Sequence, residues 1–194
     1  MRPKEESYRY QGFTIIELLL AVAVAGIVLA GFYSVYMSQQ RSYLRQEEIA
    51  AMNQNIRSAL FYMGREIRMA GLDPTGTANA GIVENLPNRI RFTEDLRGLN
   101  EDDPPNGNTE DPNEDITYTL IDSDGDGDMD LVRNNRLIAE NISSLLFDYL
   151  DGNGNIAGSL SAIRFVEVTL RAVTADGSSD RTITSRILCR NLEY

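Results

Sequence analysis

The sequence has no histidine, no tryptophan and a single cysteine among its 194 residues. Without histidine, the chain lacks the commonest general base and the commonest transition-metal ligand of proteins. With Cys189 alone it cannot form an internal disulfide, although this does not exclude an oxidising compartment. These absences weigh against catalysis, and we expect that the protein is not an enzyme.

Basic residues are scarce in one long stretch. Residues 94–130 hold fourteen acidic residues and one basic residue, Arg97, in a chain whose formal net charge is −11. Nucleic-acid binding needs clustered basic side chains that contact phosphates, and no such cluster is visible in the part of the chain after the apolar run, so we expect no nucleic-acid partner. Residues 100–115 are rich in acid, proline and glycine, which predicts an exposed loop.

The longest apolar run lies near the N-terminus. Leu18 to Val35 is almost wholly apolar, and with residues 13–17 it has the length of a membrane-spanning helix of about 20 residues. No proline interrupts residues 13–70, and Gly71 is a reasonable helix stop. We predict one long helix that is apolar all round in its first half and carries an apolar stripe in its second half. The stripe consists of Ile49, Met52, Ile56, Ala59, Leu60, Met63, Ile67 and Ala70.

The rest of the chain has the pattern of short strands separated by turn residues. In one of them Val166, Val168 and Leu170 alternate with polar residues, which predicts a half-buried strand. Cys189 shares a face with Ile187 in the last strand, so we expect a small buried side chain and not a reactive thiol. The predicted strands are 89–93, 115–121, 130–135, 143–150, 162–174 and 181–190. The expected fold class is therefore α+β, with the long helix packed on a β-rich globular head that contains an antiparallel sheet.

A glutamate near the start of the apolar run needs a partner, because a carboxylate in a bilayer costs on the order of 2.5–3.5 kcal/mol. The short polar leader, Gly12, Phe13, Glu17 and the unbroken helix together resemble the N-terminal signal of type IV pilins and of type II secretion pseudopilins. The resemblance implies that a prepilin peptidase cuts between Gly12 and Phe13 and that Phe13 is then methylated. It also implies that Glu17 pairs with the N-terminus of a neighbouring subunit in an assembled fibre. The alternative is a plain membrane anchor with a tolerated glutamate near the interface.

Three further segments, residues 63–71, 137–155 and 163–174, resemble PilW-type minor pilins, which are related to J-type minor pseudopilins. This resemblance implies a minor pilin that helps to initiate or cap a type IV pilus. The alternative is a minor pseudopilin at the tip of a type II secretion pseudopilus. The implied partners are the prepilin peptidase, other minor and major pilins or pseudopilins, the inner-membrane assembly platform and, before assembly, membrane lipid.

The same resemblance implies an organisation and a location. The expected parts are a leader at 1–12, a transmembrane helix at 13–36, an amphipathic helix at 37–72 and a head at 73–194. The expected location is the inner membrane, as a single-pass prepilin with its head in the periplasm, followed by the pilus or pseudopilus at the cell surface.

A second motif, DSDGDGDMD at 122–130, places five aspartates in nine residues, and we call it the aspartate loop. It resembles the calcium loops of EF-hand-like and extracellular repeat proteins. The implied Ca²⁺ ligands are side-chain oxygens of Asp122, Asp124 and Asp126, the backbone carbonyl of Asp128, and a direct or water-mediated contact from Asp130. Arg133 stands where an EF-hand needs a bidentate glutamate, so we predict a calcium-clipped β-hairpin with a Kd of roughly 10⁻⁴–10⁻³ M. The alternative is a solvated acidic turn.

An enzymatic alternative would use the same aspartates to hold catalytic Mg²⁺. It is weak, because these acids lie in one continuous loop and no nucleophile and base pair accompanies them. The shorter run Asp151 to Asn155 is a poorer metal candidate and is expected to be an Asx-rich turn.

Overall fold

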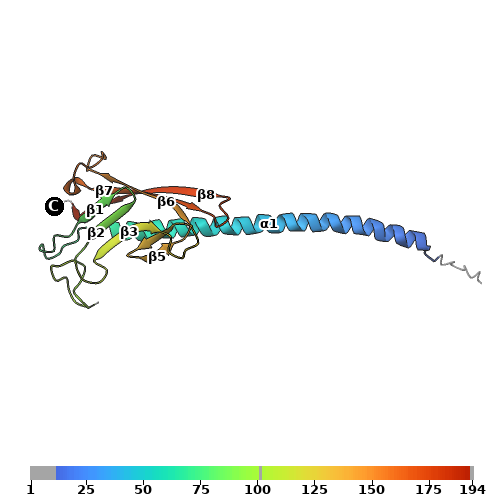
Figure 1. The fold of residues 1–194 in the computed structure, drawn as a ribbon, viewed down its shortest axis with the longest axis horizontal. Helices are drawn as coiled ribbons and strands as arrows, with labels where there is room; N and C mark the ends of the chain where they lie inside the picture. The colour runs from blue at the N-terminus through green and yellow to red at the C-terminus, as the bar shows by residue number, and fades with distance from the viewer. Residues whose placement is uncertain (1–11, 101, 193–194) are drawn as a thin grey trace, which may run out of the picture. The chain divides into compact units, whose positions relative to one another are not determined.

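The computed structural model of the chain describes residues 12–100 and 102–192 (Figure 1). Its elements in chain order are α1 (Ile15–Ile67), β1 (Ile82–Leu86), β2 (Arg89–Thr93), β3 (Asp115–Ile121), β4 (Asp130–Arg133), β5 (Arg136–Ala139), β6 (Ile142–Leu150), the 3₁₀ turn η1 (Leu160–Ala162), β7 (Phe165–Val173), β8 (Asp180–Leu188) and the 3₁₀ turn η2 (Arg190–Leu192). The predicted α+β class is confirmed: β1 to β5 form an antiparallel sheet in that order, and β6 to β8 form a second one.

The chain divides into two compact units, residues 1–46 and 47–194. The described part of the first unit contains the N-terminal part of α1, and its large apolar side chains are exposed, from Phe13 at 92% to Leu44 at 49%. By length and composition this stretch of helix is able to cross a membrane. Apolar side chains exposed over such a length are typical of a surface that lipid or another protein covers.

In the second unit the apolar stripe of α1 is buried against both sheets, as Figure 1 shows for the C-terminal part of the helix beside the strands. Every predicted stripe residue from Met52 to Ala70 is buried. The prediction for Ile49 was wrong, because its side chain is 37% exposed and lies one turn before the helix meets the core. Cys189 is fully buried as predicted.

The two sheets are tied together where the β1–β2 turn meets β6. The Phe147 amide donates to the Pro87 carbonyl at 2.7 Å. The Tyr149 hydroxyl donates to the carbonyls of Leu86 at 3.0 Å and Arg89 at 3.2 Å. These hydrogen bonds connect β6 of the second sheet to the β1–β2 turn of the first.

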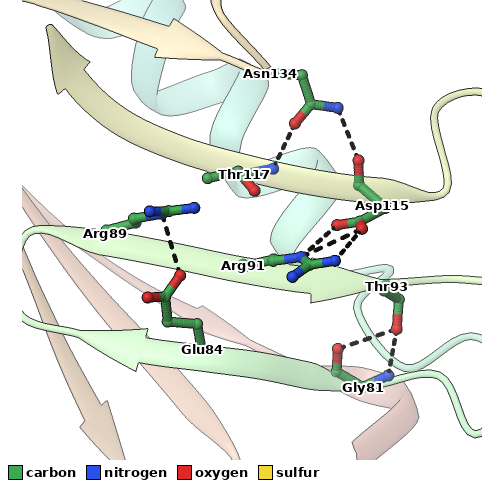
Figure 2. Close-up of polar contacts among 8 residues, drawn as sticks. All are labelled: Gly81, Glu84, Arg89, Arg91, Thr93, Asp115, Thr117 and Asn134. Carbon is green, nitrogen blue, oxygen red and sulfur yellow. Dashed lines mark hydrogen bonds and ion pairs between the residues drawn. The ribbon is translucent and has the colours of Figure 1, made fainter.

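Polar side chains fix the register of the first sheet on one of its faces (Figure 2). Arg91 on β2 forms two hydrogen bonds from its Nε to the carboxylate of Asp115 on β3, at 2.9 and 3.2 Å. Arg89 pairs with Glu84 across β1 and β2 at 3.1 Å. Contacts of this kind connect diagonal positions of neighbouring strands, so a slip in register would break them.

Several predicted boundaries were wrong. The predicted strand 130–135 ends at Arg133, because Asn134 and Asn135 form the β4–β5 turn with φ of 47° and 64°. The strand predicted at 162–174 begins only at Phe165, after η1. The last predicted strand, 181–190, runs from Asp180 to Leu188. The strands β1 and β5 were not predicted.

The helix ends at Ile67, three residues before the end of the proline-free stretch 13–70 and five before the end of the amphipathic helix expected at 37–72. Gly71 still marks the point where the chain turns away: its φ is +81°, and its amide donates to the Thr93 carbonyl at 3.0 Å. A Cβ at this position would lie 2.5 Å from the side chain of Leu192, so the turn requires glycine for space as well as for conformation.

Candidate functional sites

The first turn of α1 is closed by a reciprocal pair of hydrogen bonds between Thr14 and Glu17. The Glu17 amide donates to Thr14 Oγ1 at 3.3 Å, and the Thr14 amide donates back to Glu17 Oε2 at 2.9 Å. The Thr14 hydroxyl also donates to the same carboxylate oxygen at 2.9 Å. This arrangement is a capping box, in which threonine is the N-cap and glutamate the third helical residue. Sequence analysis missed it, although the spacing Thr-x-x-Glu at 14–17 is its signature.

The predicted cleavage point lies just before this cap. Gly12 and Phe13 are exposed and lie outside the helix, which begins at Ile15. The Gly12–Phe13 peptide bond is therefore not locked in helical hydrogen bonding. The leader residues 1–11 lie outside the described residues. Phe13 thus lies just before α1 and Glu17 in its first turn, and the implied cleavage, methylation and charge pairing stay predictions.

The aspartate loop connects β3 to β4, so the predicted β-hairpin is confirmed and no helices flank it. Its tip is folded by its own carboxylates: Asp122 accepts from the amides of Gly125 at 2.7 Å and Gly127 at 3.2 Å, and Asp126 accepts from Asp128 at 2.9 Å. Gly125 and Gly127 have φ of 81° and 96°, which permits the tight path.

Three of the predicted ligands converge. One carboxylate oxygen from each of Asp122, Asp124 and Asp126 lies within 4.8 Å of the other two, and all three side chains are exposed. Carboxylate oxygens are the ligand type of hard cations such as Ca²⁺, which takes about six to eight oxygens, so these three would be part of a shell. Asp128 is exposed and outside this group, and the expected contribution of its carbonyl stays a prediction.

Asp130 is placed differently from the other loop aspartates. It is buried, and its Oδ2 accepts hydrogen bonds from the amide and hydroxyl of Ser123. Its Oδ1 accepts from the Asn141 amide at 3.3 Å. Through these hydrogen bonds the carboxylate closes the base of the loop. The predicted contact of Asp130 with Ca²⁺ stays a prediction.

A partly buried polar cluster connects α1 to the first sheet, and it was not predicted from the sequence. Arg133 Nε on β4 lies 2.9 Å from Glu66 Oε2, and the Tyr118 hydroxyl on β3 donates to the same oxygen at 2.6 Å. Burial raises the pKa of Tyr118, and the charge of Glu66 raises it further. One residue in the sequence could have indicated this cluster. Glu66 stands three residues after Met63, so it lies on the side of the helix that carries the apolar stripe.

The acidic segment between β2 and β3 is less exposed than predicted. Glu114 is fully buried, and its Oε1 accepts from the amides of Leu96 at 2.8 Å and Arg97 at 2.9 Å. Asp95 is fully buried as well and accepts from the amide of Asn106 at 3.2 Å. These loop amides donate to carboxylates where a strand's amides would donate to the carbonyls of a neighbouring strand. The acidic side chains here are therefore structural.

The run from Asp151 to Asn155 forms the predicted Asx turn. Asp151 Oδ1 accepts from the amides of Asn153 at 2.8 Å and Asn155 at 2.9 Å. The hydrogen bond from the Asn155 amide leads the causes that hold the pKa of Asp151 below its ordinary value.

Residues 8–33 match the family described as the prokaryotic N-terminal methylation motif. The match spans Gly12, Phe13 and Glu17 and indicates a pilin- or pseudopilin-type protein, which is a structural class and not an enzyme family. The motif implies processing by a prepilin peptidase and assembly with other pilin-type subunits. With the apolar helix, it fits anchoring in the inner membrane. Neither a curated protein nor a solved structure matches the chain significantly.

Proposed function

We propose that this chain is a minor pilin that helps to initiate or cap a type IV pilus. The observation that carries the proposal is the methylation motif, placed on an exposed Gly12–Phe13 bond directly before a capped apolar helix. Cleavage there releases the leader and leaves the helix on the mature protein. The exposed apolar side chains of the first unit would then be covered by lipid before assembly and by neighbouring helices afterwards.

The minor role rests on the head. The resemblance of residues 63–71, 137–155 and 163–174 to PilW-type minor pilins supports it, and these segments form the end of α1, β6 and β7. In this proposal the head lies in the periplasm and contacts other minor subunits, and the assembly platform adds the chain to the fibre. The main alternative is a minor pseudopilin of a type II secretion pseudopilus, for which the same helix would serve.

Processing is tested by expressing the full chain with a prepilin peptidase and measuring its intact mass and N-terminal sequence. The proposal expects a chain that begins at Phe13 and carries one methyl group. Gly12→Leu is expected to leave uncleaved precursor, whereas Gly26→Leu, a matched change in open space on α1, is expected to be cleaved normally. A wild-type chain that still begins at Met1 would overturn the assignment.

The two fibre types are separated by deletion. Loss of surface pili with normal protein export supports the minor pilin, and loss of export with normal pili supports the pseudopilin. Deletion with neither effect would contradict both roles.

We also propose that the aspartate loop binds Ca²⁺ weakly, because three carboxylate oxygens already lie within 4.8 Å of one another. Bound Ca²⁺ would offset the repulsion among these aspartates and stiffen the β3–β4 hairpin. Asp122, Asp124 and Asp126 would hold it, with the Asp128 carbonyl completing part of the shell.

Calcium binding is tested by calorimetric titration of the full chain in a non-ionic detergent. Heat with a midpoint near 0.1–1 mM, of the order expected for extracellular sites, is the predicted result. Asp124→Asn with Asp126→Asn is expected to abolish it. Asp102→Asn with Glu110→Gln removes the same charge from exposed positions outside the loop and is expected to leave it intact. Absence of heat and of any rise in Tm at millimolar Ca²⁺ would remove the proposal.

A further inference from the structure

A pocket of about 580 Å³ lies in the second unit between α1, the segment that follows β2, and the β4–β5 hairpin. Its lining residues include Arg65, Arg97, Arg133 and Arg136 together with the apolar residues Leu96 and Leu137. These arginines come from three separate parts of the chain, namely α1, the segment after β2 and the β4–β5 hairpin, so the fold brings them together.

The charge of this pocket is opposite to that of the molecule. Four arginines line it against two carboxylates, Glu66 and Glu94, in a chain with a net charge of −11. Glu66 is already paired with Arg133. The Arg65 guanidinium lies 5.7 Å from the centre of the Tyr62 ring, an arrangement that holds it at the pocket. Arg97 also has a polar or electrostatic contact of its own, so Arg65 and Arg136 supply the positive charge by which this concave region favours an anion.

Glu94 gives the pocket an unsatisfied group. Its side chain is 5% exposed, and its Oε2 is buried without a hydrogen-bond partner. Burial is the largest cause that raises the pKa of Glu94 to about 7, and the charge of Glu66 adds to it. In its neutral form this carboxyl carries an O–H that needs an acceptor.

The charged and titratable groups around Glu94 come from each element that meets it. They are Glu66, Arg65 and Tyr62 on α1, Arg97 in its own segment, Glu114 before β3, Arg133 on β4 and Arg136 on β5. The carboxylates disfavour ionisation of Glu94, and Arg133 and Arg65 favour it. Because Glu94 Oε2 is buried, Glu94 acts on an incoming carboxylate through its charge: the neutral form takes a negative charge away from the pocket, where the carboxylate pairs with the arginines.

We propose that this pocket binds an acidic side chain of a partner protein, presented on a peptide segment. A peptide fits better than a free small anion because the pocket also has apolar lining, including Met69 and Ile138, which would contact the stem of a glutamate and its neighbours. The proposal is independent of the pilin-type function, since it follows from the head alone.

The probe is a fluorescein-labelled hexaglutamate peptide, and its anisotropy is followed as the full chain is added in non-ionic detergent. Arg65→Glu and Arg136→Glu are each expected to weaken binding by at least about tenfold, because a charge pair becomes a repulsion. Both arginines are exposed, so the fold is expected to survive, which circular dichroism checks.

Arg57→Glu is the matched control, because it changes the same charge on an exposed face of α1 outside the pocket. It is expected to bind the peptide like wild type. Equal weakening by Arg57→Glu, or no binding to wild type, would overturn the proposal. Displacement of the peptide by equimolar inorganic phosphate would overturn it too, since the site would then take any small anion.

Glu94 predicts a pH dependence of peptide affinity that charge attraction to the arginines alone does not produce. A carboxyl that titrates near pH 7 is about one-tenth protonated at pH 8 and nine-tenths at pH 6, so affinity is expected to rise roughly tenfold on acidification. The chain has no histidine to produce such a change. Glu94→Gln keeps a donor without a charge and is expected to bind equally at both pH values. A pH dependence that persists in Glu94→Gln would contradict the proposal.

Discussion

At the scale of single residues, the position with the clearest consequence is Glu66, a carboxylate on the buried stripe of α1. It is held by Arg133 and by the Tyr118 hydroxyl, which donates at 2.6 Å. Tyr118→Phe is expected to lower the free energy of unfolding by about 2 kcal/mol, because a buried hydrogen bond to a charged group is lost.

Urea unfolding of the full chain in non-ionic detergent measures this change. Tyr149→Phe is the control, since its hydroxyl donates to neutral carbonyls and the expected loss is only about 1 kcal/mol. Equal losses for the two variants would mean that the charge of Glu66 adds nothing to the Tyr118 bond.

A second residue prediction concerns pH and Glu94, whose pKa burial raises to about 7. The folded state therefore holds a proton on Glu94 more tightly than the unfolded state does. The stability contributed by the neutral form is complete below the unfolded pKa of 4.5 and is lost as pH rises towards 7. Glu94→Gln avoids this loss, so above pH 7 the variant is expected to be more stable than wild type by about 1–2 kcal/mol. Melting curves at pH 5 and pH 8 test this, and an advantage confined to pH 5 would contradict it.

Sequence patterns predicted the apolar residues better than the buried polar ones. Cys189 was correctly placed in the core by its strand face, and burial raises its pKa to about 12. Glu114 was assigned to the exposed loop at 100–115, because acids next to proline and glycine are usually exposed, and no burial was predicted for Glu94. Their burial depends on amides and arginines that come from other parts of the chain.

At the scale of elements, the β4–β5 turn offers a matched pair of substitutions. Asn134 and Asn135 both have left-handed backbone conformations, which glycine adopts without strain. Asn135→Gly is expected to stabilise the protein by about 0.5 kcal/mol, because Asn-Gly is the favoured pair for a two-residue hairpin turn. Thermal unfolding measures the gain.

Asn134→Gly should act in the opposite direction. The Asn134 side chain accepts from the Thr117 amide at 2.7 Å and donates to the Asp115 carbonyl at 2.7 Å (Figure 2). Removal of this side chain is expected to lower the free energy of unfolding by about 1 kcal/mol, although glycine adopts the left-handed conformation without strain. Stabilisation by both substitutions would show that these side-chain bonds contribute nothing.

The strands that sequence analysis missed share one property. β1 and β5 are the two edges of the first sheet, and each has only one buried residue, Ile82 and Ala139 respectively. Without alternate burial they lack the period of two by which a strand is recognised. The central strand β7, with Val166, Val168 and Leu170 buried, was recognised because neighbours on both sides and the helix bury one face of it.

At the scale of the whole molecule, the chain combines a head with its own core and a helical unit whose apolar side chains remain exposed. Sequence alone predicted both, because an apolar run without polar faces and a striped helix differ in period and composition. It could not predict the arginine pocket, since its arginines come from three distant parts of the chain and share no motif.

Glu17 has two roles to distinguish, one within its own chain and one in the proposed fibre, and a pair of substitutions separates them. In the isolated chain Glu17 accepts the Thr14 amide in the capping box, a role that needs a side-chain oxygen but no charge. The proposed pairing with the N-terminus of a neighbouring subunit needs the charge. Glu17→Gln keeps the oxygen and removes the charge, whereas Thr14→Ala keeps the charge and removes the cap hydroxyl.

If charge pairing governs assembly, Glu17→Gln is expected to be cleaved normally but to be missing from sheared surface fibres. Immunoblots of the fibre fraction measure this, in cells whose membranes contain equal amounts of the variant and the wild type. Thr14→Ala weakens the cap by about 1 kcal/mol and is expected to enter fibres at a level near wild type. The reverse ranking, with Glu17→Gln assembled and Thr14→Ala excluded, would mean that fibres select for a closed first helical turn, and the glutamate would then act only within its own chain.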